Sequence, residues 1–162
     1  MKRLKQFTKV SKKHIFENEN DYINCSGIYH LYYMNTVVYV GITRVSLTDR
    51  LLDHLCQRKR FHYVSLFDCK RYHPNGMDDL EGEEIDHIRK YRPFYNIIYN
   101  SGKLKRKETP DEIDLFNRAS KESEYIAMLM VTEDKEERNE IKTKGRKLWE
   151  FDYENNKFLN EV

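Results

Sequence analysis

The chain has 162 residues, which is enough to bury one hydrophobic core but short for two independent domains. Charged residues make up 35% of it, no run approaches the roughly 20 apolar residues of a membrane span, and the three cysteines have no C-x-x-C spacing. We therefore expect a cytoplasmic protein with reduced thiols, and no membrane segment, signal peptide, disulfide framework or zinc site.

Positive charge is concentrated in the first part of the chain. Residues 1–100 contain 16 Lys and Arg against 12 Asp and Glu, a net charge of +4, whereas residues 101–162 contain 13 against 15, a net charge of −2. An anionic partner is therefore expected on the first part. We divide the chain into an N-terminal strap at residues 1–24, a compact domain at 25–100 and a C-terminal extension at 101–162.

After the strap, residues 27–41 read GIYHLYYMNTVVYVG and predict a β-hairpin. Side chains alternate along paired strands, so Tyr29 and Tyr39 share one face only if the loop contains an odd number of residues. A three-residue loop at 34–36 meets that condition. It also places Gly41 opposite Tyr29, where a missing side chain leaves room for a ligand.

A helix is expected next, because Ser46 is followed three residues later by an acid, as in a capping box. Its predicted buried stripe consists of Leu47, Leu51, Leu52 and Leu55. Arg50 and His54 lie four residues apart and share a second face. Two donors placed in this way can converge on one phosphate.

Residues 61–69 predict a third strand, and residues 71–76, which contain Pro-Asn-Gly, predict a turn. A second helix is expected from about residue 78 to 91. Glu84 falls within its apolar stripe, where a carboxylate is costly unless it is paired or holds a metal ion. Its neighbours Glu81 and Glu83 are expected to point elsewhere, into solvent.

The last third of the chain predicts a linker followed by helices. Residues 101–107 are basic and favour a solvated linker over a DNA contact, and Thr109 followed by proline is typical of a helix start. Residues 125–131 are apolar enough to be buried, and residues 132–147 form a charged helix candidate. We expect a mostly helical extension that packs on the compact domain.

In order and spacing, the motifs of residues 25–100 resemble the GIY-YIG nuclease family. The chain contains Gly27-Ile28-Tyr29, nine further residues, Tyr39-Val40-Gly41, then Arg50 and His54 on a helix, and Glu84 twelve residues before Asn96. The resemblance implies an α/β (α+β) domain in which a small three-stranded antiparallel sheet is flanked by helices. It also implies one divalent metal ion and cleavage of phosphodiester bonds, usually in DNA.

Residue roles follow from the resemblance, position by position. Tyr29 would be the general base or its helper, Tyr39 a second phenol beside the phosphate, Arg50 the charge stabiliser, His54 an auxiliary donor or relay, and Glu84 the metal ligand, with Gly41 and Asn96 as supports. A lone carboxylate suits Mg²⁺ or Mn²⁺. Only about 0.1% of a tyrosine with a pKa near 10 is phenolate at neutral pH. Tyr29 therefore needs a cation that lowers its pKa, or a metal-bound hydroxide that takes its proton.

Four further residues are weaker candidates for contact with nucleic acid. Arg44 either replaces a lysine that some family members carry after the glycine or contacts backbone phosphates, His62 could reach the site from the third strand, and Lys59 and Arg60 lie in a basic connector. The predicted function is a metal-dependent DNA endonuclease, with RNA left open as a substrate and the oligomeric state left open. The alternatives are a catalytically inactive nucleic-acid-binding module and a restriction endonuclease that acts as an oligomer.

Overall fold

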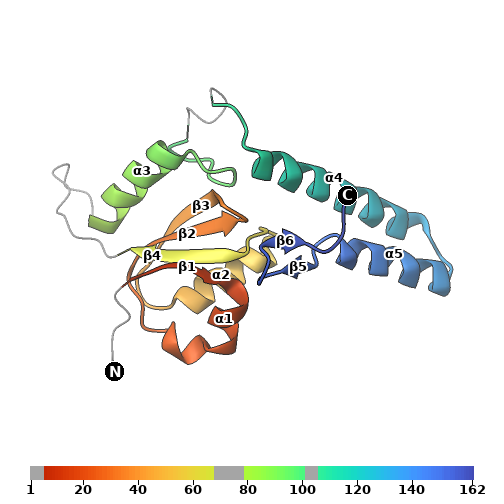
Figure 1. Ribbon diagram of the computed structural model, residues 1–162, viewed down its shortest axis with the longest axis horizontal. Coiled ribbons are helices and arrows are strands. Elements are labelled where there is room, and N and C mark those ends of the chain that lie inside the picture. Colours follow the sequence, from red (N-terminus) through yellow and green to blue (C-terminus); the bar gives the residue numbers. More distant parts are fainter. Residues whose placement is uncertain (1–5, 68–78, 101–105) are drawn as a thin grey trace. The chain divides into compact units, whose positions relative to one another are not determined.

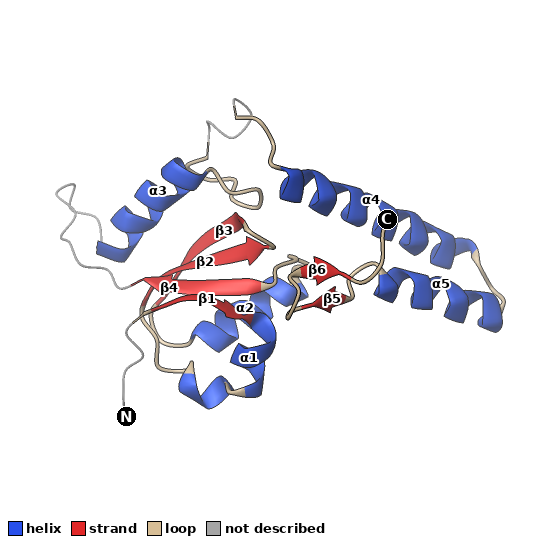
Figure 2. Cartoon of the chain, viewed as in Figure 1, coloured by secondary structure: helices blue, strands red, loops and turns tan. Residues whose placement is uncertain are grey.

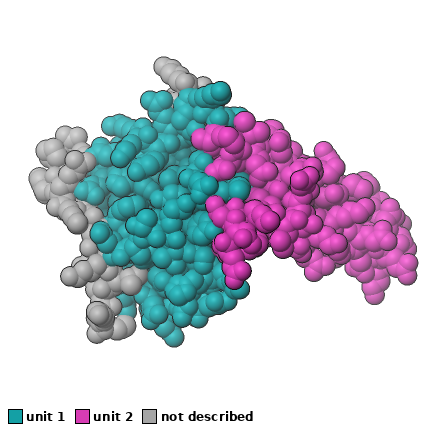
Figure 3. Space-filling model, in the orientation of Figure 1, with its two compact units in different colours: residues 1–108 teal, residues 109–162 magenta. Residues whose placement is uncertain are grey.

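The computed structural model describes residues 6–67, 79–100 and 106–162. They form two compact units, residues 1–108 and 109–162 (Figure 3). Both helices and an antiparallel sheet are present, which confirms the predicted α+β class (Figures 1 and 2). The turn expected at 71–76, the start of the linker at 101–105 and Cys69 lie outside the described residues. No described helix has the length and apolar character to cross a membrane.

The first unit is built on a sheet of four antiparallel strands, one more than expected. They are β1 (Phe7–Ser11), β2 (Gly27–Tyr33), β3 (Thr36–Thr43) and β4 (Tyr63–Phe67), in the order β1-β4-β2-β3. The additional strand, β1, lies at an edge of the sheet and pairs with β4.

The predicted N-terminal strap at residues 1–24 is therefore wrong for residues 6–24, which the structure describes. The segment forms β1, helix α1 (Lys12–Glu17) and the short 3₁₀ helix η1 (Glu19–Asp21). The lysines of this segment made its sequence look unlike a strand, but edge strands commonly carry lysine. The ammonium of Lys9 lies 5.3 Å and 5.4 Å from the ring centres of Tyr32 and Tyr63, so this lysine packs on neighbouring strands.

The hairpin of β2 and β3 satisfies the parity condition by an unexpected route. Tyr29 pairs with Gly41 and Leu31 with Tyr39, so the two tyrosines share a face, as predicted. The connecting turn has two residues, Met34 and Asn35, instead of three. The odd residue is supplied by a β-bulge, because the register shifts after the Leu31–Tyr39 pair and leaves Val38 without an opposite partner.

Helix α2 (Leu47–Cys56) begins as predicted, with the Ser46 hydroxyl accepting a hydrogen bond from the Asp49 amide at 3.2 Å. Its buried face consists of Leu47, Thr48, Leu51 and His54. Leu52 is 46% exposed, so the expected leucine stripe is wrong at this position. Successive residues are about 100° apart around a helix, and Leu52 is therefore turned away from the face that contains Leu51.

Helix α3 (Asp79–Tyr91) packs on β2 and β3, where Leu80 and Ile88 contact Ile28 and Val40. Figure 1 shows α3 on one side of the sheet and α1 and α2 on the other. Glu83 is only 9% exposed, which corrects the expectation that it is solvated. Glu83 lies three residues after Leu80 and five before Ile88, at the border of the apolar stripe. The packing that buries the stripe therefore also buries Glu83.

A buried histidine pair joins α3 to the sheet. Nε2 of His30, a residue 1% exposed, lies 2.8 Å from Nδ1 of His87, and the His30 ring also contacts Phe67 and Tyr91. Burial, together with the nearby His87 and Lys90, lowers the pKa of His30 to about 3. In the unfolded chain a histidine has a pKa near 6.5. The unfolded state therefore takes up a proton below about pH 6.5 that the folded state excludes.

We expect the free energy of unfolding to fall as the pH is lowered from about 6.5 toward 3, by up to about 1.4 kcal/mol per pH unit for one such histidine. Urea denaturation at several pH values measures this slope. His30→Gln should reduce the slope but not abolish it, because His54, whose pKa is lowered to about 4, contributes to it as well. The exposed His14→Gln should leave it unchanged. An unaltered slope in His30→Gln would contradict this account.

The second unit consists of α4 (Pro110–Val131), α5 (Lys135–Lys147) and a small hairpin of β5 (Phe151–Asp152) and β6 (Lys157–Phe158). The predicted helix start is confirmed, because Thr109 and Glu112 form a complete capping box. The expected burial of residues 125–131 is wrong, since Met130 is 83% and Val131 82% exposed. A helix packed on one partner buries one face, so consecutive apolar residues cannot all be covered.

Candidate active site

Five of the predicted site residues, Tyr29, Tyr39, Arg50, His54 and Glu84, line one cavity of about 210 Å³ in the first unit. Its lining consists of Tyr29 from β2, Tyr39 and Ile42 from β3, Arg50, Asp53, His54 and Gln57 from α2, and Glu84 from α3. Residues separated by up to 55 positions thus meet at one place. Asp53 and Gln57 were not predicted, although their helical spacing from Arg50 and His54 could have identified them.

Gly41 allows the two tyrosine rings to lie over β3. A Cβ atom at this position would lie 2.6 Å from both Cζ and the hydroxyl oxygen of Tyr29, and 2.8 Å from Cε1 of Tyr39. The ring centres of the two tyrosines are 6.1 Å apart. The predicted opposition of Gly41 and Tyr29 is therefore confirmed, but the tyrosine rings themselves fill the space that was expected to hold a ligand.

Tyr29 and His54 form a buried hydrogen bond, with 2.6 Å between the phenol oxygen and Nε2. Tyr29 is 2% and His54 6% exposed. Burial raises the pKa of Tyr29 above its ordinary value, and Tyr39 reinforces the shift while Arg50 opposes it. Burial also lowers the pKa of His54 to about 4, helped by the positive charges of Lys59 and Arg50.

At neutral pH, therefore, Tyr29 keeps its proton and His54 is neutral, and the phenol oxygen and Nε2 share one hydrogen bond. Nδ1 of His54 is buried and has no hydrogen-bond partner among the described residues. Arg50 lowers the pKa of Tyr29 by less than burial raises it, so the tyrosine is not a preformed phenolate. The arrangement instead provides a proton acceptor directly behind the phenol.

Glu84 and Arg50 bring opposite charges to the cavity. Glu84 is half-buried, and burial and the nearby Glu81 raise the pKa of its carboxyl, whereas Arg50 and Arg44 oppose that shift. Within the described residues its carboxylate has no hydrogen-bond or ion-pair partner at contact distance. Arg50 is exposed and can therefore approach an anion that enters the cavity.

The donor set fits a hard divalent cation with few protein ligands. Glu84 lines the cavity together with a second carboxylate, Asp53, which is exposed. Among the described residues there is no group of three or more His, Cys, Asp or Glu side chains that could enclose a metal. Mg²⁺ and Mn²⁺ suit such a place, because Mg²⁺ commonly keeps several waters and binds through one or two carboxylates.

None of the four weaker candidates is among the residues that line the cavity. The Lys59 ammonium lies 4.9 Å from the ring centre of Tyr39, and Nη2 of Arg44 lies 3.7 Å from Oε1 of Glu81. His62 is 5% exposed and its ring contacts Tyr33, so it does not reach the cavity from the third strand. The backbone amide of Arg60 donates to the Tyr95 hydroxyl at 3.0 Å.

Asn96 supports the site from the edge of the sheet, as expected. Its side-chain oxygen accepts from the Val40 amide and its side-chain nitrogen donates to the Val40 carbonyl, both at 2.9 Å. Val40 lies between Tyr39 and Gly41, so this pairing fixes the strand segment that carries them. The amide of Tyr95 adds a hydrogen bond of 2.8 Å to the carbonyl of Val38.

Asn96→Ala should lower the free energy of unfolding by about 2 kcal/mol, since two buried backbone groups of Val40 lose their partner. Urea denaturation followed by circular dichroism measures the change. Asn20→Ala, at an exposed asparagine of the same unit, is the matched control and should unfold like the wild type. Equal midpoints for both variants would show that Asn96 is not a structural support.

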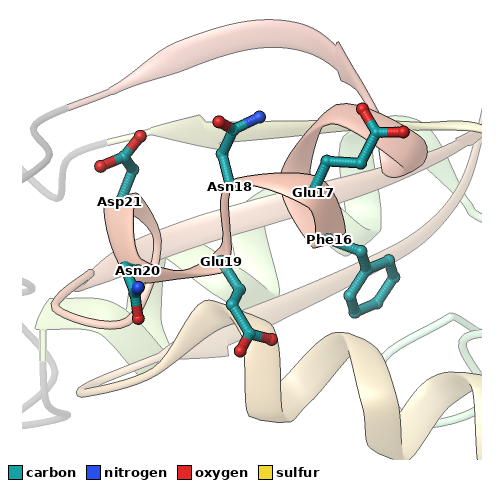
Figure 4. A pocket seen from close by; sticks show the side chains of 6 residues that line it. All are labelled: Phe16, Glu17, Asn18, Glu19, Asn20 and Asp21. Carbon is teal, nitrogen blue, oxygen red and sulfur yellow. The ribbon is translucent and has the colours of Figure 1, made fainter.

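A second hollow, of about 450 Å³, lies beside α1 and η1 and is lined by residues 16–21. Figure 4 shows Glu19 pointing away from Glu17 and Asp21, so the three carboxylates do not converge. A hollow lined by acids repels phosphate, and we therefore place the chemistry in the cavity of Tyr29 and Glu84.

Comparisons of this chain with protein-family models, with curated proteins and with solved structures find no match.

Proposed function

We propose that the protein is a metal-dependent endonuclease that hydrolyses phosphodiester bonds in DNA. The observation that carries the proposal is the convergence of Tyr29, Tyr39, Arg50, His54 and Glu84 on one cavity. Attack on a phosphodiester needs a base for the water, positive charge for the developing anion and a place for a divalent ion. The lining supplies side chains suited to each of these tasks.

The Tyr29–His54 hydrogen bond suggests how the base works. As water attacks phosphorus, its proton passes to the phenol oxygen of Tyr29 while the tyrosine's own proton passes to Nε2 of His54. Tyr29 thus remains neutral and His54 receives the charge, so the pKa of His54, lowered to about 4, must be raised by the negative charge of the bound phosphate. The displaced sugar oxygen takes a proton from a second water, and the hydroxide that remains is neutralised by the proton held on His54.

Arg50 and Tyr39 would hold the phosphate during this step. Arg50 is the exposed cation of the lining and would donate to the non-bridging oxygens, whose negative charge grows in the transition state. The Tyr39 ring lies beside His54, with ring centres 4.3 Å apart and ring planes tilted by 60°, and its hydroxyl would orient the phosphate beside the relay. Glu84, with water, would hold Mg²⁺ or Mn²⁺, which when bound supplies Lewis-acid stabilisation of the phosphate.

The full chain should convert supercoiled plasmid to the open-circular form with Mg²⁺ or Mn²⁺ and should leave it intact in EDTA. Agarose electrophoresis at several enzyme concentrations measures the conversion. Plasmid that is bound but stays uncut with both ions would favour the inactive binding module instead. Discrete fragments from a long duplex would favour a site-specific restriction endonuclease.

A further inference from the structure

An apolar loop projects from the first unit immediately after Asn96. Ile97 is 89%, Ile98 71% and Tyr99 48% exposed, whereas the asparagines on either side, Asn96 and Asn100, are 8% and 7% exposed. Two adjacent isoleucines with this exposure leave much apolar surface in water. Such a patch commonly marks a surface that contacts a partner.

The loop is held in this shape by its two buried asparagines. The side-chain nitrogen of Asn100 donates to the carbonyls of Pro93, at 2.8 Å, and Asn96, at 3.0 Å, which closes the base of the loop. Tyr99 adopts a φ of 62°, in the left-handed region that non-glycine residues rarely occupy. The isoleucines are therefore presented to solvent by a fixed loop.

The base of the loop is connected to the wall of the cavity. Asn96 binds both backbone groups of Val40, and Val40 stands between Tyr39 and Gly41 in β3. The loop thus begins at a residue that is bound to the strand segment carrying Tyr39 and Gly41.

The charge of the surrounding segment identifies the kind of partner. Among the described residues of this stretch, 87–100 and 106–107, there are five Lys and Arg and no Asp or Glu. In the described part, Arg89 and Lys90 are exposed at the end of α3, and the Arg106 guanidinium donates to the carbonyl of Arg92 at 2.8 Å. Exposed apolar residues in a cationic stretch of chain complement a polyanion with apolar base faces, which is the chemistry of DNA.

We propose that Ile97 and Ile98 form a wedge that enters between base pairs of duplex DNA beside the cleaved phosphodiester, with Tyr99 against an exposed base face. Proteins that insert isoleucine between base steps unstack and bend the duplex. The inference rests on the proposed function and extends it, since the preferred substrate is then DNA that is easily unstacked or bent at the cut.

The test uses the full chain in EDTA and a duplex that carries several 2-aminopurine–thymine pairs, whose fluorescence rises wherever a base is unstacked. At saturation the wild type should raise the fluorescence at least twofold. The double variant Ile97→Ser/Ile98→Ser should give no rise and should bind about tenfold more weakly. Leu159→Ser, at a 60% exposed leucine of the second unit, is the matched control and should behave as the wild type.

Two results would overturn the wedge: saturated wild type without a rise in fluorescence, or a double variant with the full rise. Light scattering tests whether Ile97 and Ile98 instead contact a second copy of this chain. If the wild type is a dimer, the double variant a monomer and the fluorescence signal the same for both, the loop joins two copies of the chain and the proposal is wrong.

The parallel nicking assay with Mn²⁺ separates this inference from the proposed function. Unstacking without nicking would overturn the nuclease proposal and leave the wedge intact. Nicking without unstacking would overturn the wedge and leave the nuclease intact.

Discussion

Tyr29→Phe should lower the nicking rate by about 10³-fold, within the range of general acid–base catalysis. The substitution removes one oxygen atom, and this oxygen makes the 2.6 Å hydrogen bond to His54. Without it, the water has no route by which its proton can reach the imidazole. Initial rates on supercoiled plasmid, with circular dichroism to check folding, measure the effect.

Tyr32→Phe is the matched control for that experiment. Tyr32 lies in the same strand on the opposite face, where its hydroxyl accepts a hydrogen bond from the Ser65 hydroxyl at 3.3 Å. Its loss should change the nicking rate by less than about twofold, because no transition-state interaction is removed. A Tyr29→Phe protein that nicks at the wild-type rate would remove the tyrosine from the mechanism.

Glu84→Gln should reduce nicking by a similar factor, about 10³-fold or more, and higher Mg²⁺ should not restore it. Glutamine keeps the shape of the side chain but lacks the negative charge that a divalent ion requires. The same change should leave the melting temperature equal to or above that of the wild type, since burial disfavours the charged carboxyl of Glu84.

The two readouts together are diagnostic of a functional acid. Loss of activity with unchanged or higher stability indicates a residue kept for chemistry, whereas loss of both indicates a structural role. Glu81→Gln, at the exposed glutamate one turn earlier, should leave activity within about twofold as the control. Equal nicking rates for the wild type and Glu84→Gln would show that Glu84 is not the metal ligand.

Local chemical signals explain what could be predicted from the sequence. The glycine–tyrosine hairpin, the serine cap of α2, the capping box at Thr109 and the acid within the stripe of α3 are each readable over a few residues. Together with the spacing of Arg50 and His54, they were enough to assemble five residues that line one cavity. The prediction that Tyr29 and Tyr39 share a face is confirmed although the predicted three-residue turn is wrong. The bulge at Val38 supplies the extra residue that the shorter turn lacks.

The features that were missed depend on contacts between distant segments. Pairing of β1 with β4 joins residues more than 50 positions apart, and the sequence of Phe7–Ser11 does not indicate which strand it pairs with. The burial of His62 and Glu83 is likewise set by elements packed over them. The hydrogen bond between Tyr29 and His54 could not be predicted, because periodicity alone does not show how deeply each side chain is buried.

The pairing of Asn96 with Val40 also affects how molecules of this protein meet one another. β3 is the last strand of its sheet, and the free backbone groups of such a strand can recruit a strand from another chain. Tyr95 and Asn96 occupy those groups at Val38 and Val40. The loop that steadies the cavity wall thereby also shields the sheet against edge-to-edge aggregation.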